Sequence, residues 1–147
     1  MTNDRHAGRL SIAVSFWFFV VSLIGCTVHY VAEYDAGVRD EILRIAKEVD
    51  LFYGQLLDTA PAERQYKKYK DDYVKIETDL RALGMRNEIR PLNKESTKQT
   101  QIALDLWQDD KESHKKDNAV DDATLRTHRK QFARVFVAMA KGEEAKQ

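Results

Sequence analysis

Residues 66–83 read YKKYKDDYVKIETDLRAL, and their aromatic and aliphatic side chains recur every three or four positions. That spacing places them along one face of an α-helix, and this face leaves water only when other helices cover it. The recurring residues are Tyr66, Tyr69, Tyr73, Ile76, Leu80 and Leu83. The stretch therefore predicts one helix of a helical bundle.

The sequence before this stretch predicts a first helix that ends at about Leu57. Its apolar residues also recur at helical spacing: Val31, Val38, Ile42, Ile45, Val49, Phe52 and Leu56. Because this stripe starts within an uncharged N-terminal segment, we expect the helix to be continuous with a membrane anchor. Residues 58–61 then supply a capping residue and a proline, the order that separates two helices.

After the stretch, we expect Gly84 to end the second helix, residues 85–90 to form a connection before Pro91, and a third helix to cover residues 92–116. The residues expected to face inward are Ile102, Ala103, Leu106 and Trp107. Residues 108–116 are almost wholly polar, which predicts an exposed or frayed second half. Met85, Ile89, Leu92 and Ser96 also keep a helical period, so one kinked rod in place of two helices stays open.

A fourth helix is expected from a cap at Asp121 or Asp122 to Gly142. Its inward residues would be Leu125, His128, Phe132, Val135 and Met139, with Phe136 beside them. Helices of similar length joined by short connections predict an all-α protein with an up-down-up-down bundle. The bundle would cover residues 33–142, with a charged tail at 143–147, and its C-terminus would return to the end where the first helix starts.

The composition agrees with a helical protein and argues against nucleic-acid binding. The 24 Lys and Arg residues balance the 24 Asp and Glu residues, so no net positive charge attracts a nucleic acid. Six glycines and two prolines among 147 residues are too few for the turns of a many-stranded fold. The single cysteine, Cys26, excludes an intramolecular disulfide.

Residues 10–32 contain no charged side chain, and their number suits a helix that crosses a bilayer. Arg5 and Arg9 precede this segment, whereas Glu33 and Asp35 follow it. The positive-inside rule therefore predicts that residues 1–9 are cytoplasmic and that the bundle is periplasmic or extracellular in a bacterial cell envelope.

The run from Leu23 to Cys26, Leu-Ile-Gly-Cys, opens a second interpretation of this segment. It resembles the lipobox of bacterial lipoproteins, which implies cleavage before Cys26 and lipidation of that residue. The residues that follow Cys26 are apolar and aromatic, where a lipoprotein usually carries a polar tether. A transmembrane anchor and a lipoprotein signal segment therefore both stay open.

Few residues indicate chemistry. Asp110 and His114 share a helix face, and His128 can approach them from the fourth helix, so these three are candidate metal ligands. Haem-attachment, phosphate-loop and nucleophile motifs are missing from the sequence. We therefore predict a non-catalytic protein without a cofactor.

The connection between the second and third helices interleaves apolar and cationic residues, as partner-binding loops do. Its candidate partner-binding residues are Arg86, Ile89, Arg90 and Leu92. The simpler interpretation is that Met85, Ile89 and Leu92 cover the end of the bundle.

These observations favour a membrane-tethered interaction or accessory subunit of an envelope complex, with the membrane and a protein as partners and with self-association left open. The alternative is a ligand-sensing module, because the layout is similar to the four-helix sensor domains of bacterial receptors, although no motif is shared. A metal-binding bundle built on Asp110, His114 and His128 is the third hypothesis.

Overall fold

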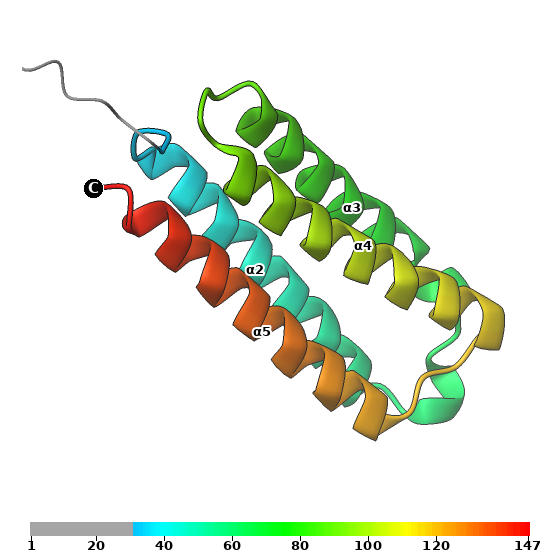
Figure 1. The fold of residues 1–147 in the computed structure, drawn as a ribbon. Helices are drawn as coiled ribbons and strands as arrows, with labels where there is room; N and C mark the ends of the chain where they lie inside the picture. Colours follow the sequence, from blue (N-terminus) through cyan, green and yellow to red (C-terminus); the bar gives the residue numbers. More distant parts are fainter. Residues whose placement is uncertain (1–30) are drawn as a thin grey trace, which may run out of the picture.

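The computed structural model describes residues 31–147, which form four α-helices and one short 3-10 turn (Figure 1). The elements are α2 (Ala36–Asp58), η1 (Pro61–Glu63), α3 (Tyr66–Glu88), α4 (Lys94–Asp117) and α5 (Asp122–Glu144). Helix α2 packs against α3 and α5, and α4 packs against the same two helices. The expected up-down-up-down bundle is thereby confirmed for this part of the chain.

Figure 1 shows that the start of α2, the α3–α4 connection and the C-terminus share one end of the bundle. We call it the entry end, because the chain enters the described part there. The η1 turn and the α4–α5 connection form the far end. At the far end the buried Arg64 donates to the carbonyls of Thr59 (2.8 Å) and Val120 (3.0 Å) and to Asp122 (2.7 Å). Arg64 thus ties the end of α2 to the start of α5.

The first helix does not continue from the preceding segment, contrary to our expectation. Residues 31–35 are not helical, and the Asp35 carboxylate accepts a hydrogen bond from the Val38 amide (3.1 Å) as the N-cap of α2. This cap satisfies an amide that has no partner inside the helix, so it starts the helix at Ala36. Most of the predicted anchor, with Cys26 and residues 1–9, lies outside the described residues. Within residues 31–147, no helix has both the length and the apolar character needed to cross a bilayer.

The second and third helices are separate, so the kinked-rod alternative is wrong. Helix α3 also passes through Gly84, where we expected a stop, and ends at Glu88. Its last turn is held by the buried Asn87, whose side-chain amide donates to Thr100 of α4 (2.9 Å). Helix α5 likewise passes through Gly142 and ends at Glu144, so the expected tail begins inside a helix.

Aromatic rings fill the middle of the core. The rings of Phe52, Tyr73 and Trp107 lie within 5.0 Å of one another between centroids, and Phe132 meets Trp107 at 5.7 Å. The indole N–H of the fully buried Trp107 donates to the Tyr73 carbonyl (3.0 Å), so its only polar group is satisfied. The buried stripe of α3 matches the prediction from Tyr69 to Leu83.

Helix α4 buries most of the face that we expected, because Ala103 and Trp107 are fully buried and Leu106 packs against the core. Ile102 is 45% exposed, whereas the buried residues are Thr100, Ala103, Leu104, Trp107 and His114. The polar second half is helical to Asp117 and turns His114 into the core. Thr100 and His114 occupy inward positions and have hydrogen-bond partners on α3, which a count of apolar residues alone could not identify.

Candidate functional site

Two groups of polar residues could carry a function, one at each end of the bundle. The first surrounds the α3–α4 connection at the entry end, where the four candidate partner-binding residues lie. The second lies nearer the far end, between α2, α4 and α5, and contains the three candidate metal ligands.

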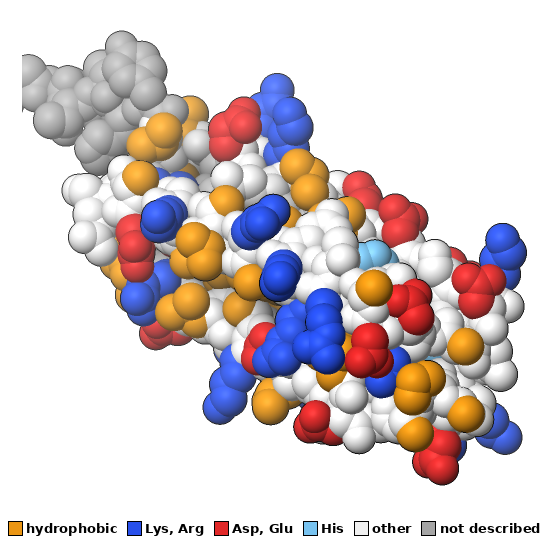
Figure 2. Space-filling model, turned by 90° about the horizontal axis from the view of Figure 1, so that it is seen from below, with side chains coloured by type: hydrophobic (Ala, Val, Ile, Leu, Met, Phe, Trp, Pro, Cys, Tyr) orange, Lys and Arg blue, Asp and Glu red, His pale blue; other side chains and the backbone are white. Residues whose placement is uncertain are grey.

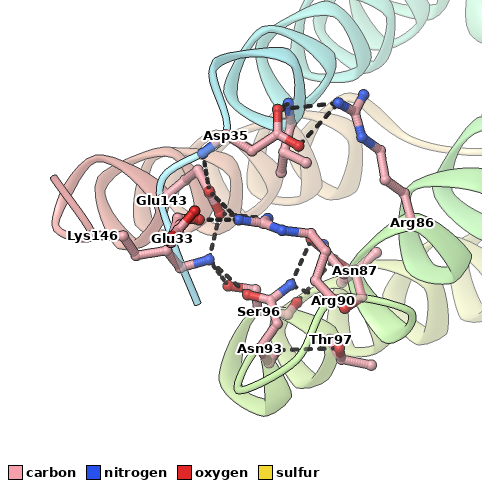
Figure 3. A network of polar contacts seen from close by, with 12 residues as sticks. Glu33, Asp35, Arg86, Asn87, Arg90, Asn93, Ser96, Thr97, Glu143 and Lys146 are labelled. Atoms are coloured by element: carbon pink, nitrogen blue, oxygen red, sulfur yellow. Dashed lines mark hydrogen bonds and ion pairs between the residues drawn. The ribbon is translucent and has the colours of Figure 1, made fainter. Parts of the chain in front are cut away.

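Glu143 of α5 is the centre of the entry-end network (Figure 3). Its side chain is 1% exposed and accepts hydrogen bonds from Arg90 (2.9 and 3.3 Å), from Lys146 (2.5 Å) and from the Asp35 backbone amide (2.9 Å). Burial raises the pKa of Glu143, but the hydrogen bonds from Arg90 and Lys146 outweigh burial and hold the pKa below its usual value. Glu143 is therefore an anion that joins α5, the connection and the entering chain.

The two candidate arginines both form ion pairs with carboxylates of this chain. Arg90 pairs with Glu143 and also donates to the Glu33 carbonyl, and its side chain is only 15% exposed. Arg86 donates to both carboxylate oxygens of Asp35 at 3.1 Å, and its side chain is 44% exposed. Their guanidinium groups hold the connection against the start of α2.

The two candidate apolar residues point away from the core. Ile89 is 82% exposed and Leu92 is 60% exposed, and Met85 nearby is 63% exposed. They do not cover the end of the described bundle, which was the simpler interpretation of the segment. Residues 31–35 and 90–92 line a depression of about 500 Å³ beside Leu92.

Leu92 adopts a backbone conformation that suits leucine poorly. Its φ angle is 59°, in the left-handed region, which costs a residue with a Cβ atom about 1–2 kcal/mol. Neighbouring hydrogen bonds impose this conformation: the Leu92 carbonyl accepts from the Ala32 amide (3.2 Å), and the Asn93 side chain donates to the Asn87 carbonyl (3.0 Å). The fold therefore holds an exposed leucine where glycine or asparagine would be more stable.

The three candidate metal ligands line one cavity but have different hydrogen-bond partners. Asp110 accepts hydrogen bonds from Tyr53 of α2 and from His128 Nδ1 of α5 (2.8 Å). His114 Nε2 instead donates to the Arg64 carbonyl (2.7 Å), and His114 Nδ1 accepts from the Tyr73 hydroxyl (3.2 Å). Both nitrogens of His114 are thus occupied, and no group of three metal-ligating side chains forms within residues 31–147.

Burial perturbs the acid–base properties of this second group. Burial raises the pKa of Asp110 although Tyr53 and His128 donate to it, and burial lowers the pKa of His114. A cavity of about 120 Å³, which Tyr53, Asp110, His114 and His128 help to line, lies between them. The arrangement can share a proton among three helices, through Tyr53, Asp110 and His128.

The sequence interpretation missed Arg64, Glu143 and Lys146. Glu143 lies among charged residues at the end of the chain, a position typical of a solvated tail. One signal was present: Glu143 continues the inward stripe of α5 after Phe136 and Met139, three and four residues apart.

Comparison with known proteins found no matching family model, no matching curated protein and no matching solved structure.

Proposed function

We propose that this protein is a membrane-tethered, non-catalytic interaction subunit of an envelope complex, and that its α3–α4 connection docks on a protein partner near the membrane surface. The observation that carries this proposal is Leu92. Its exposed side chain stands on a strained backbone that the surrounding hydrogen bonds enforce. A leucine there costs stability in the free protein, so an apolar contact with a partner is the benefit that offsets it.

The position of the connection supports the same proposal. Leu92 is hydrogen-bonded through its carbonyl to Ala32, the last residue of the uncharged segment 10–32. A tether at that segment would keep the connection close to the bilayer and raise its effective concentration for a membrane partner. Weak apolar contacts from Ile89 and Leu92 would then suffice for assembly.

The ion pairs of Arg86 and Arg90 with other residues of the chain restrict the docking surface that we propose to the apolar residues of the connection. Both arginines hold the α3–α4 connection in place, because the guanidinium group of Arg86 pairs with Asp35 and that of Arg90 pairs with Glu143. The groups available to a partner are therefore the apolar side chains, chiefly Ile89, with 82% of its surface exposed, and Leu92.

The test compares Leu92→Asn with Leu51→Asn, the same change at a leucine of α2 that is 53% exposed and lies towards the far end. Asparagine tolerates the left-handed region, so Leu92→Asn should keep or raise stability. The full chain is extracted gently from the membranes of its own host, and native mass spectrometry weighs the protein with any stoichiometric companion.

We expect a companion with the unmodified chain and with Leu51→Asn, and its loss with Leu92→Asn. Equal recovery from both variants would refute docking through Leu92. A chain that never carries a companion would refute the accessory-subunit proposal itself.

A further inference from the structure

A groove of about 380 Å³ runs along the surface between α2 and α5. Its apolar lining is Leu43, Ala46, Val49, Phe132, Ala133, Phe136, Val137 and Ala140. Leu43 is 42% exposed and Val137 is 54% exposed, and they form opposite walls on α2 and α5. The small side chains of the alanines make the surface concave between these walls.

Ion pairs that cross from one helix to the other bound the groove. Arg129 of α5 binds the Asp50 carboxylate with two short hydrogen bonds (2.6 and 2.7 Å) at the end nearer η1. Arg39 of α2 binds Glu144 (2.9 Å) one turn beyond the other end. From Arg39 to Asp50, α2 rises about 16 Å, which is room for three turns of a docked helix.

The charge on this face is unbalanced. Lys47 and Lys141 line the groove, and Lys130 and Arg134 follow on the exposed side of α5. None of these four cations forms an ion pair within residues 31–147, whereas the acids Asp40, Asp50 and Glu144 on the same face are all paired with Arg39 or Arg129. Figure 2 shows one long face of the bundle, on which hydrophobic side chains lie between Lys and Arg side chains, with Asp and Glu side chains nearby.

We propose that this groove binds an amphipathic helix of another protein, with apolar residues at positions i, i+3 or i+4 and i+7 and with acidic residues on both sides of that stripe. The apolar residues would fill the hollow between Leu43 and Val137, as in other helix-in-groove complexes. The acidic residues would pair with Lys47 on one side and Lys141 on the other, which sets the choice of partner and speeds the encounter.

Charge and shape argue against two other occupants. A second copy of the bundle that presents the same face would bring Lys47 and Lys141 close to their own counterparts, and like charges repel. An anionic membrane would satisfy the cations but is flat on this scale, so it would leave the hollow floor of Phe132 and Phe136 without contact. A narrow acidic helix satisfies both the charge and the shape.

The experiment is a selection on the full chain with a displayed library of helical peptides. The apolar stripe of the library is varied among Leu, Ile, Val and Ala, and each flanking position is varied among Glu, Gln and Lys. We expect enrichment of Glu at the flanks. We then expect the selected peptides to bind at least about tenfold more weakly to Val137→Asp, with an unchanged affinity for Val74→Asp.

Val74 is the matched control because it is an equally exposed valine (48%) in the middle of α3, outside the groove. The double variant Lys47→Glu/Lys141→Glu reverses both charges. It should bind Glu-flanked peptides more weakly, and that binding should lose most of its dependence on salt concentration. Both residues are exposed and unpaired among the described residues, so the variant should still fold, which circular dichroism checks.

Several results would overturn the proposal. Enrichment of Lys or Gln at the flanks, or no enrichment, would exclude an acidic helix. Equal binding to Val137→Asp and Val74→Asp would place the peptides elsewhere. If the chain self-associates in sedimentation experiments and Val137→Asp abolishes this association, the groove binds a second copy. If the chain binds only vesicles that contain anionic lipid, the groove binds the membrane. A failure here leaves the separate proposal for Leu92 standing, because the two surfaces share no residue.

Discussion

Replacing Arg90 with methionine should reduce the free energy of unfolding by about 2–3 kcal/mol. Removing one partner from a buried ion pair costs about 3–5 kcal/mol when the other charge is left without compensation. Glu143 is 1% exposed, but in the variant it keeps Lys146 and the Asp35 amide, so we expect a cost below that range. Methionine preserves most of the side-chain volume, which limits the effect to the lost charge and hydrogen bonds.

Arg86→Met is the matched control, because Arg86 lies four residues earlier and also pairs with a carboxylate. Its pair with Asp35 is exposed, at 44% and 33% of the side-chain surfaces, so its loss should cost at most about 1 kcal/mol. Urea unfolding of the full chain, followed by far-ultraviolet circular dichroism, measures both variants under the same conditions. With a slope of about 1–3 kcal/mol per molar urea, the Arg90 variant should shift the midpoint by about 1 M or more.

The effect of Arg90 should also depend on pH. The pKa of Glu143 in the fold lies below its ordinary value of 4.5, so ionised Glu143 stabilises the fold above that pH. This contribution is lost as the pH falls through the lower pKa of the folded state. The stability difference between the unmodified chain and Arg90→Met should therefore shrink in acid. Equal costs for the Arg90 and Arg86 variants at neutral pH would refute the reasoning.

Three further predictions concern stability. Arg64→Met should lower the free energy of unfolding by about 3 kcal/mol, because the carbonyls of Thr59 and Val120 lose the buried Arg64 side chain as their donor. A loss below about 1 kcal/mol in urea unfolding would contradict this account. Burial lowers the pKa of His114 in the folded state below its ordinary value of 6.5. As the pH falls below 6.5, His114 therefore binds a proton in the unfolded chain before it does so in the folded one. This difference should lower the free energy of unfolding by at most about 1.4 kcal/mol per pH unit. His114→Gln should flatten that decline in urea midpoints measured from pH 7.5 to 5.5, and an unchanged slope would assign it to another group. Leu92→Gly should raise the midpoint of thermal unfolding, because glycine relieves up to about 1 kcal/mol of backbone strain at this position. A clear loss of stability would show that the Leu92 side chain packs in the free protein.

The bundle and its order of helices could be predicted because they depend on local patterns. The apolar stripe of α3 follows the helical period over six residues, and Asp121 caps α5 by accepting a hydrogen bond from the Thr124 amide (3.0 Å). Pro91 separates α3 from α4 because it lacks a backbone donor and restricts the residue before it. Each of these signals acts within a few residues of the chain.

The candidate site could be predicted only in part. Ile89 and Leu92 are exposed beside the entering chain, but the sequence could not show that Arg86 and Arg90 form ion pairs within the chain. Their partners, Asp35 and Glu143, are 51 and 53 residues away in the sequence. A salt bridge over such a distance leaves no local pattern in a single sequence.

The sequence by itself determined that four amphipathic helices alternate with short connections, since periodicity, caps and prolines act on neighbouring residues. Only the tertiary structure decided which polar residues enter the core. His114 and Glu143 are charged or polar residues in polar stretches, and they are buried because Tyr73, the Arg64 carbonyl, Arg90 and Lys146 meet them there. The cost of removing a polar group from water is offset only by partners from other elements, and folding alone brings those partners together.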